Sequence, residues 1–125
     1  MKKIISIAGA PAPIGPYSQA VLKNGTLYAS GQIAINPKSG ELVMDTLTEE
    51  TNQVMSNIGA LLDAAEMTFS DIVKCSIFLS DMHNFTAVNK IYASYFSSAP
   101  PARETVEVSC LPKNVNVEIS FIAIK

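Results

Sequence analysis

The chain has 125 residues, 48% of them hydrophobic, with 9 basic and 11 acidic side chains and a net charge of -2. This hydrophobic content excludes a disordered chain, and the length supports one core, so we expect a single domain over residues 1–125. Because Lys and Arg are scattered singly, the sequence disfavours nucleic acid and anionic membranes as partners.

The N-terminal segment and the cysteines bear on where the protein works. Residues 1–7 carry two lysines and a short apolar run, which we interpret as a strand rather than a signal peptide. No stretch approaches the roughly 18 apolar residues of a membrane span. Cys75 and Cys110 form no C-x-x-C pattern, so we expect both to be reduced and buried in a soluble, cytoplasmic protein.

The first part of the chain predicts three short strands, over residues 2–7, 18–22 and 27–33. The second and third flank Asn24-Gly25, a pair that suits the tight turn of a β-hairpin. Another turn is predicted over residues 36–40, which contain a proline and a glycine.

A helix is predicted from Thr48, with Thr46 or Thr48 as its cap. Its apolar residues recur at helical spacing, which places them on one face. They are Val54, Ile58, Leu61, Leu62 and Ala65.

The next segment, residues 71–79, has apolar side chains at alternate positions of both faces, which predicts a central strand. We assign Val73 and Cys75 to one face, and Ile72 and Phe78 to the other.

A second helix is predicted after Asp81 or Asn84, either of which can cap it, and it ends before Pro100-Pro101. Strands over 103–110 and 116–124 complete the chain. The order βββ-α-β-α-ββ predicts an α+β fold, with one mixed sheet and both helices packed on one face. The apolar face of the second helix consists of Phe85, Val88, Tyr92 and Phe96.

Two helices leave the other face of the sheet uncovered. That face carries Ile122 and Ile124 beside the polar Glu118 and Ser120. We therefore expect the protein to associate with itself through this face.

The residue types exclude most common enzyme classes. The chain has one histidine, His83, and no glycine-rich phosphate-binding loop, so metal-dependent hydrolysis, dinucleotide binding and P-loop chemistry are unsupported. His83 lies at the start of the second helix, and we expect it to face solvent rather than to act in a Ser-His-Asp triad.

Two ionisable residues stand inside otherwise apolar strands. Arg103 offers a planar fork for a substrate carboxylate, but it could equally form a salt bridge with Glu104, Glu107 or Glu118. Glu118 lies on the face opposite Val117. If another subunit covers that face, the pKa of Glu118 rises and it can act as a general base for water; otherwise it is a solvated edge-strand glutamate.

The segments Gly15-Pro16-Tyr17-Ser18 and Ser30-Gly31-Gln32 supply further polar groups. They offer a phenol, a hydroxyl and a glycine whose N–H a ligand could approach closely.

The whole chain resembles the Rid (reactive intermediate deaminase, YjgF-like) family, and most closely its archetypal RidA branch. The motifs that carry the resemblance, in chain order, are Ile14-Gly15-Pro16-Tyr17-Ser18-Gln19-Ala20, Ser30-Gly31-Gln32-Ile33, Asp71-Ile72-Val73-Lys74, Pro101-Ala102-Arg103, Leu111-Pro112-Lys113 and Val117-Glu118-Ile119.

The resemblance implies a chorismate-mutase-like homotrimer with clefts between its subunits. It implies the hydrolysis of 2-iminobutanoate and 2-iminopropanoate, which arise from enamines released by pyridoxal-phosphate enzymes, to 2-oxo acids and ammonia. No cofactor takes part. The alternative is a non-catalytic trimer that binds a 2-oxo acid or a similar small carboxylate. The translation inhibition or ribonuclease activity reported in the family would need RNA contacts, which the acidic net charge disfavours.

By the same resemblance, Arg103 binds the substrate carboxylate with help from the Gly31 N–H, and Glu118 orients and activates water. Thr105 stands where cysteine is frequent in the archetype, and its backbone could hold that water. Tyr17, Ser30 and Asn89 match positions that line the cleft.

Two residues depart from the family pattern. Glu104 follows the arginine where small residues are usual, although strand alternation should turn it to the other face. Glu66 stands at the end of the first helix where relatives tend to have glycine, which suits a left-handed cap better than glutamate does.

Overall fold

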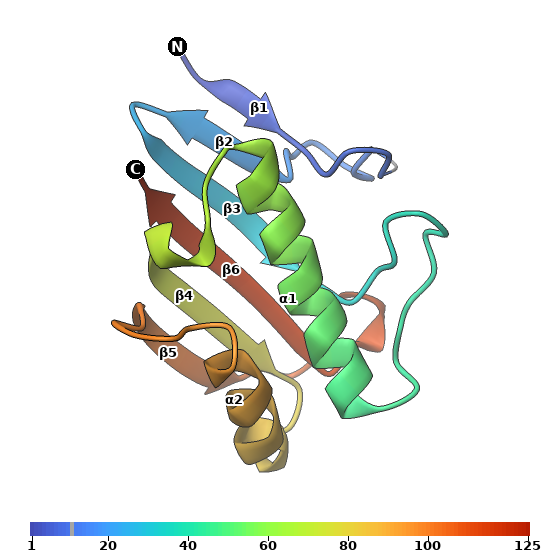
Figure 1. The fold of residues 1–125 in the computed structure, drawn as a ribbon. Helices are drawn as coiled ribbons and strands as arrows, with labels where there is room; N and C mark the ends of the chain where they lie inside the picture. The colour runs from blue at the N-terminus through green and yellow to red at the C-terminus, as the bar shows by residue number, and fades with distance from the viewer. Residues whose placement is uncertain (11) are drawn as a thin grey trace.

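The computed structural model describes residues 1–10 and 12–125, which form one six-stranded sheet and two α-helices (Figure 1). The predicted order of elements and the mixed α+β architecture are confirmed. The strands lie in the order β1-β2-β3-β6-β4-β5, and only β4 and β5 pair in parallel. Their bounds are β1 Lys3–Ile5, β2 Ala20–Lys23, β3 Thr26–Gln32, β4 Ile72–Leu79, β5 Ala102–Glu107 and β6 Val117–Ile124.

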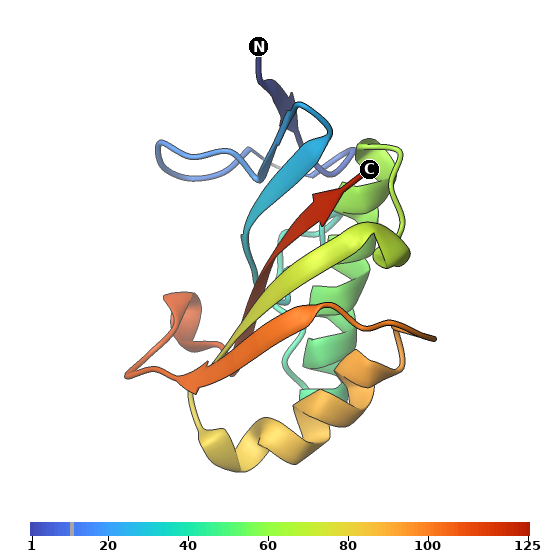
Figure 2. The same cartoon turned by 90° about the vertical axis from the view of Figure 1, so that its left-hand side faces the viewer.

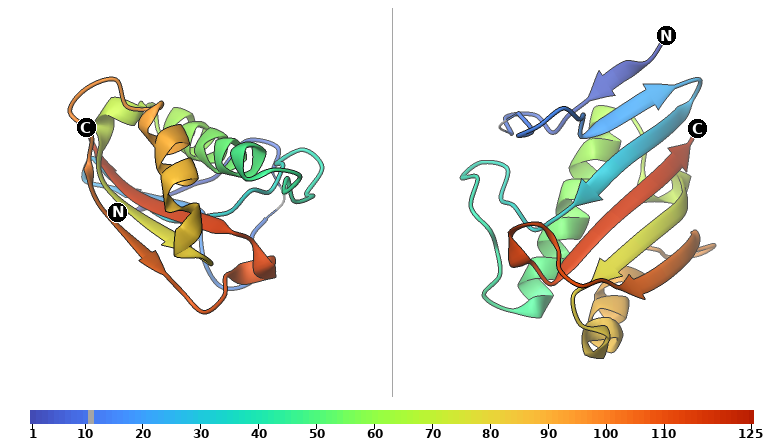
Figure 3. Two further views of the ribbon diagram at one scale, coloured as in Figure 1. Left: turned by 90° about the horizontal axis from the view of Figure 1, so that it is seen from below. Right: turned by 180° about the vertical axis from the view of Figure 1, so that it is seen from behind.

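Both α-helices cover the same face of the sheet, as predicted; the edge views of Figures 2 and 3 show this arrangement. They are α1 (Leu47–Ala64) and α2 (Phe85–Ala93). Three short 3-10 helices, η1 (Phe69–Asp71), η2 (Met82–Asn84) and η3 (Pro112–Asn114), connect the elements. Within the described part of the chain, none of the helices is long and apolar enough to cross a membrane.

The predicted hairpin and helix signals act locally as expected. Asn24 and Gly25 both have a positive φ, as a tight turn between β2 and β3 requires. The Thr46 hydroxyl accepts a hydrogen bond of 3.1 Å from the backbone N–H of Glu49, which caps α1. Asp81 accepts from the backbone N–H of His83 at the start of η2, and the His83 side chain is exposed as predicted.

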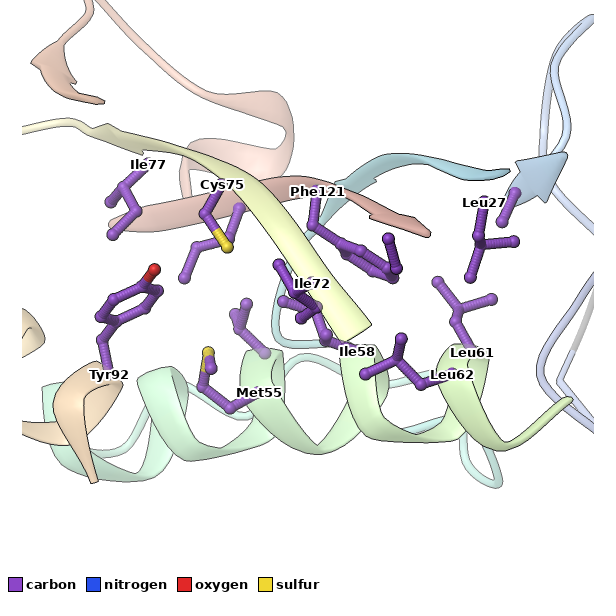
Figure 4. Close-up of a cluster of buried hydrophobic side chains, with 14 of the residues drawn as sticks. Leu27, Met55, Ile58, Leu61, Leu62, Ile72, Cys75, Ile77, Tyr92 and Phe121 are labelled. Atoms are coloured by element: carbon purple, nitrogen blue, oxygen red, sulfur yellow. The ribbon is translucent and has the colours of Figure 1, made fainter. Parts of the chain in front are cut away.

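The core lies between α1 and the sheet (Figure 4). Four apolar side chains of α1 are completely buried, and they meet alternate side chains of β3, β4 and β6. This is the packing that a helical and a two-residue periodicity produce when their apolar faces meet. The members labelled in the figure include Leu27, Met55, Ile58, Leu61, Leu62, Cys75, Ile77 and Phe121.

Two of our burial predictions are wrong. Val73 is exposed and Ile72 is buried, because the register of β4 against β6 shifts between Ile72 and Lys74 and inverts the alternation there. Cys110 is exposed rather than buried, because β5 ends at Glu107 and leaves the cysteine in the following loop. Cys75 is buried as predicted.

Among the described residues, no α-helix covers the opposite face of the sheet; Figure 3 shows it from behind. We call it the open face, and define it by Tyr28, Glu104, Glu118, Ser120 and Ile122. Tyr28 is 52% exposed, and Ser120 and Ile122 are half-buried. Apolar surface on this face is thus left accessible in the single chain.

Glu66 adopts the left-handed conformation that the sequence predicts for it, with a φ of 58° just after α1. The backbone N–H of Met67 donates to the Leu62 carbonyl, which closes the helix end. A non-glycine residue here carries the conformational cost that the sequence comparison with the family indicates.

A buried carboxyl group holds β6 against α1. Glu50 is completely buried, and its two carboxyl oxygens accept hydrogen bonds of 2.8 and 2.7 Å from the backbone N–H and the side-chain amide of Asn116. Asn116 directly precedes β6, so this pair fixes where the strand that carries Glu118 begins.

We expect Glu50→Ala to lower the free energy of unfolding by about 2–4 kcal/mol, because it leaves two Asn116 donors without a partner in a buried environment. Glu50→Gln should cost less, since one acceptor oxygen remains. Denaturant titration measures both, with the exposed neighbour substitution Glu49→Ala as the control. Equal losses for Glu49→Ala and Glu50→Ala would contradict this role.

Candidate active site

Arg103 lies on the helix-covered face of the sheet, beneath α2. It pairs with Cys75 across β4 and β5, and Cys75 belongs to the buried core. Its Nη1 donates a hydrogen bond of 2.5 Å to the Asn89 side-chain oxygen. The guanidinium also lies over the rings of Phe85 and Tyr92, 5.7 and 5.0 Å from their centroids.

The sequence left open whether Arg103 anchors an anion or joins a salt bridge. The two glutamates nearest to it in sequence bond other residues. Glu104 forms an ion pair with Lys74 at 2.9 Å and accepts a hydrogen bond from Ser76, and Glu107 accepts one of 2.7 Å from the Met82 N–H. Across residues 1–10 and 12–125, the only hydrogen bond of the guanidinium is to Asn89. Its remaining N–H groups are therefore available to an external carboxylate.

Glu104, as strand alternation predicts, lies on the open face and away from Arg103. Its negative charge is held by Lys74 and Ser76, and these hydrogen bonds lower the pKa of the carboxyl. The departure from the family pattern therefore places no charge in the surroundings of Arg103.

Glu118 lies on the open face, where it pairs with Phe78 across β6 and β4. Its side chain packs against Gly31, so closely that a Cβ at position 31 would overlap the carboxyl group. Gly31 lies within the register shift of β3 against β6, and a glycine in a strand often marks such an irregularity or a close approach. Burial raises the pKa of the Glu118 carboxyl above its ordinary value.

A cleft of about 450 Å³ at the end of β3 brings together three of the predicted residues, Tyr17, Gly31 and Glu118. Most of its other lining is apolar, including Ile7 and Ile33. A mainly apolar cleft with a few convergent polar groups is typical of a small-molecule site.

Ser30 and Thr105 do not face that cleft. The Ser30 hydroxyl donates at 2.7 Å to the Ser18 carbonyl, which ties the segment after Tyr17 to β3. Thr105 lies two residues beyond Arg103 on the same face of β5, and its buried hydroxyl has no hydrogen-bond partner among the described residues. In this chain, Ser30 therefore positions backbone, and Thr105 belongs with Arg103.

Two cleft residues, Gln19 and Lys113, carried no assigned role in the sequence analysis. The Gln19 side-chain oxygen accepts a hydrogen bond of 2.8 Å from the Ile7 N–H, which holds one wall of the cleft. Lys113 brings a positive charge to the lining from η3, where it has a φ of 56°. Both residues belong to motifs that carry the family resemblance, and these motifs could have identified them as cleft residues.

The predicted residues thus form two groups that one chain does not join. Arg103, Asn89 and Thr105 lie on or under the helix-covered face, whereas Glu118 lies on the open face with Tyr17 and Gly31. Because the sheet separates the two groups, neither face of a single chain presents both Arg103 and Glu118.

This arrangement of motifs can be compared with known proteins. The profile of the protein family described as Endoribonuclease L-PSP, the YjgF/Rid family, matches residues 7–125. The chain belongs to the Rid family.

Three Rid relatives show how close the similarity is. The 2-iminobutanoate/2-iminopropanoate deaminase of Capra hircus is 48% identical over 125 residues, which cover all of this chain and 91% of the relative. A RutC family protein of Pyrococcus horikoshii is 47% identical and is covered to 99%. The structure of YyfA from Yersinia pestis, a Rid protein of unknown function, has a TM-score of 0.95 and 51% identity, with full coverage of both chains.

We expect Glu118→Gln to be more stable than the parent protein at pH 7, with the difference vanishing below about pH 4. A raised carboxyl pKa means that the folded state holds the proton more tightly than the unfolded chain does. The stability associated with the protonated form is therefore complete below the unfolded pKa and is lost as pH rises through the folded pKa.

Denaturant titrations from pH 4 to 8 at one protein concentration measure this difference. The control is Glu41→Gln in an exposed loop. A Glu118→Gln effect that is independent of pH would contradict a raised pKa.

Proposed function

We propose that this Rid protein is a deaminase that hydrolyses 2-iminobutanoate and 2-iminopropanoate to the 2-oxo acids and ammonia. The observation that carries the proposal is the state of Arg103, a half-buried guanidinium that no carboxylate of the described chain neutralises. The name of the Capra hircus relative supports the substrate class. We further propose that the reaction takes place in the cytoplasm, where pyridoxal-phosphate enzymes release such intermediates.

The site in this proposal forms between two subunits of a homotrimer with the chorismate-mutase-like arrangement. Its support is the separation of the two groups: Arg103 of one subunit would meet Glu118 and Tyr17 of the next. The accessible apolar side chains of the open face supply surface for such an assembly. A ring of three identical head-to-tail contacts closes on itself and leaves no surface unpaired.

In the proposed mechanism, Arg103 and the Gly31 N–H hold the substrate carboxylate and thereby place the imine carbon beside a water molecule. Glu118 takes a proton from this water as its oxygen bonds to the carbon. That proton passes to the imine nitrogen, which completes a carbinolamine. Glu118 then takes the hydroxyl proton and passes it to the amino nitrogen, so that the C–N bond breaks, the C=O forms and ammonia leaves. The Tyr17 phenol and the Thr105 backbone would hold the water.

The chemistry of the substrate suits so small a set of groups. An imine carbon is already electrophilic, so an anchor for the carboxylate and a base for the water are the main requirements. Because burial raises its pKa, the Glu118 carboxylate is a stronger base than an ordinary glutamate and takes the proton from water more readily.

The family description names an endoribonuclease, and RNA cleavage is a separate activity that our test can detect. The net charge of -2 does not favour it, since RNA binding rests on neutralising phosphates with basic side chains.

We expect Arg103→Ala to lower kcat/KM for 2-iminobutanoate by about 100-fold, because a charge-assisted hydrogen-bond pair to the carboxylate is lost. Glu118→Gln should lower kcat by about 10²–10⁴-fold through loss of the general base. A threonine dehydratase generates the imine, and semicarbazide traps what survives.

The control is Lys90→Ala, which removes an exposed cation from the helix that covers Arg103. Full activity of Arg103→Ala would contradict the anchor. Binding of 2-oxobutanoate without imine turnover would replace the deaminase with a binding protein, and salt-sensitive RNA cleavage by the pure protein would favour the ribonuclease.

A further inference from the structure

Arg103 is the only arginine in the chain. Its hydrogen bond and both of its contacts with aromatic rings come from one helix, α2. Phe85, Asn89 and Tyr92 stand at positions i, i+4 and i+7 of α2, so they share one face of that helix. We call these three residues the α2 clamp.

The clamp holds the guanidinium in two ways. The Asn89 oxygen takes one N–H of Nη1 at 2.5 Å, which fixes the orientation of the fork in its plane. The rings of Phe85 and Tyr92 lie 5.7 and 5.0 Å from the guanidinium carbon, within the range of a cation–π contact. Together these contacts leave the other nitrogens of the fork free for a carboxylate.

Tyr92 is the part of the clamp that is tied most firmly to the core. It is 4% exposed, and its ring packs on Phe96 at a centroid distance of 4.9 Å. Figure 4 shows its hydroxyl pointing toward β4, in the region of Cys75 and Ile77. Tyr92 therefore couples the position of Arg103 to the interior of the protein.

The hydroxyl of Tyr92 has no hydrogen-bond partner of ordinary geometry among the described residues. Burial raises the pKa of Tyr92 and of the Cys75 thiol beside it, so both groups stay neutral and neither supplies a counter-charge to Arg103. The ring, rather than the hydroxyl, is therefore the group that acts on the guanidinium.

We propose that Tyr92 is a positioning residue, whose ring holds Arg103 in the geometry that receives the substrate carboxylate. The inference rests on the proposed function of Arg103 as the anion anchor. A free arginine side chain loses rotamer freedom when it binds an anion, and a clamped one has already lost it. Removing the ring should therefore weaken carboxylate binding without slowing the chemical step.

The experiment compares Tyr92→Leu with Tyr92→Phe, which keeps the ring. The control Tyr95→Leu removes a neighbouring aromatic side chain whose hydroxyl bonds Asn52 and whose ring packs on Phe69. Calorimetry gives Kd for 2-oxobutanoate, and steady-state kinetics separate KM from kcat. Labelling arginine with ¹⁵N gives a single Nε–H signal, because the chain has one arginine.

We expect Tyr92→Leu to raise Kd and KM by about tenfold with kcat little changed, and to shift the arginine signal as the ring is lost. Tyr92→Phe and Tyr95→Leu should retain the parent values. An unchanged Kd and an unchanged arginine signal in folded Tyr92→Leu would overturn the proposal, as would a loss in Tyr92→Phe equal to that in Tyr92→Leu.

If Tyr92→Leu does not fold, Phe85→Leu tests the same clamp, because Phe85 is half-buried and its ring also contacts the guanidinium. We expect a smaller shift of the arginine signal in this variant, and the absence of any shift would overturn the proposal. The arginine signal also separates this inference from the proposed function. A parent protein that neither turns over imines nor binds 2-oxobutanoate would refute the function, whereas the signal would still report whether the ring holds Arg103.

Discussion

Strand alternation in a sheet covered on one side is the constraint on which the rest of this structure depends. Successive side chains of a strand point to opposite faces, so Arg103 reaches the helices and Glu118 reaches the open face. A change of rotamer cannot carry either group through the sheet. If Arg103 and Glu118 act on one substrate as we propose, they therefore come from different copies of the chain, which meet at the open face.

The two helices divide the remaining work. The long helix α1 builds the core and, through buried Glu50, fixes the start of the strand that carries Glu118. The short helix α2 contributes only Val88 and Tyr92 to the buried set, and its other inward residues surround Arg103. In this account, α1 positions the base and α2 positions the anchor, from opposite sides of one sheet.

Much of the architecture could be predicted because it follows from local signals. The Asn24-Gly25 turn, the Thr46 cap and the helical spacing of apolar residues are properties of short segments, and the structure confirms each. Val73 and Cys110 were misplaced because their exposure depends on a register shift and on where β5 stops pairing, which are set by neighbouring strands.

The sequence predicts which residues form the site better than it predicts how they are arranged. The motifs singled out Arg103 and Glu118, and alternation within each strand correctly gave the face of Glu118 relative to Val117. No pattern within one strand tells that Arg103 and Glu118 lie on different faces of the sheet, since that depends on how β5 and β6 are registered against β4. Likewise, the bond from Arg103 to Asn89 joins elements whose contact only the packed fold defines.

The central claim is that each working site draws Arg103 and Glu118 from two different subunits, and subunit mixing tests it most directly. Arg103→Ala and Glu118→Gln chains, each strongly impaired alone, carry different tags, are co-expressed, and are purified as mixed assemblies. In every mixed ring of three, one of the three contacts joins an intact Arg103 to an intact Glu118, so about a third of the parent imine turnover should return. Verified mixed assemblies that stay as inactive as the separate variants would contradict the account.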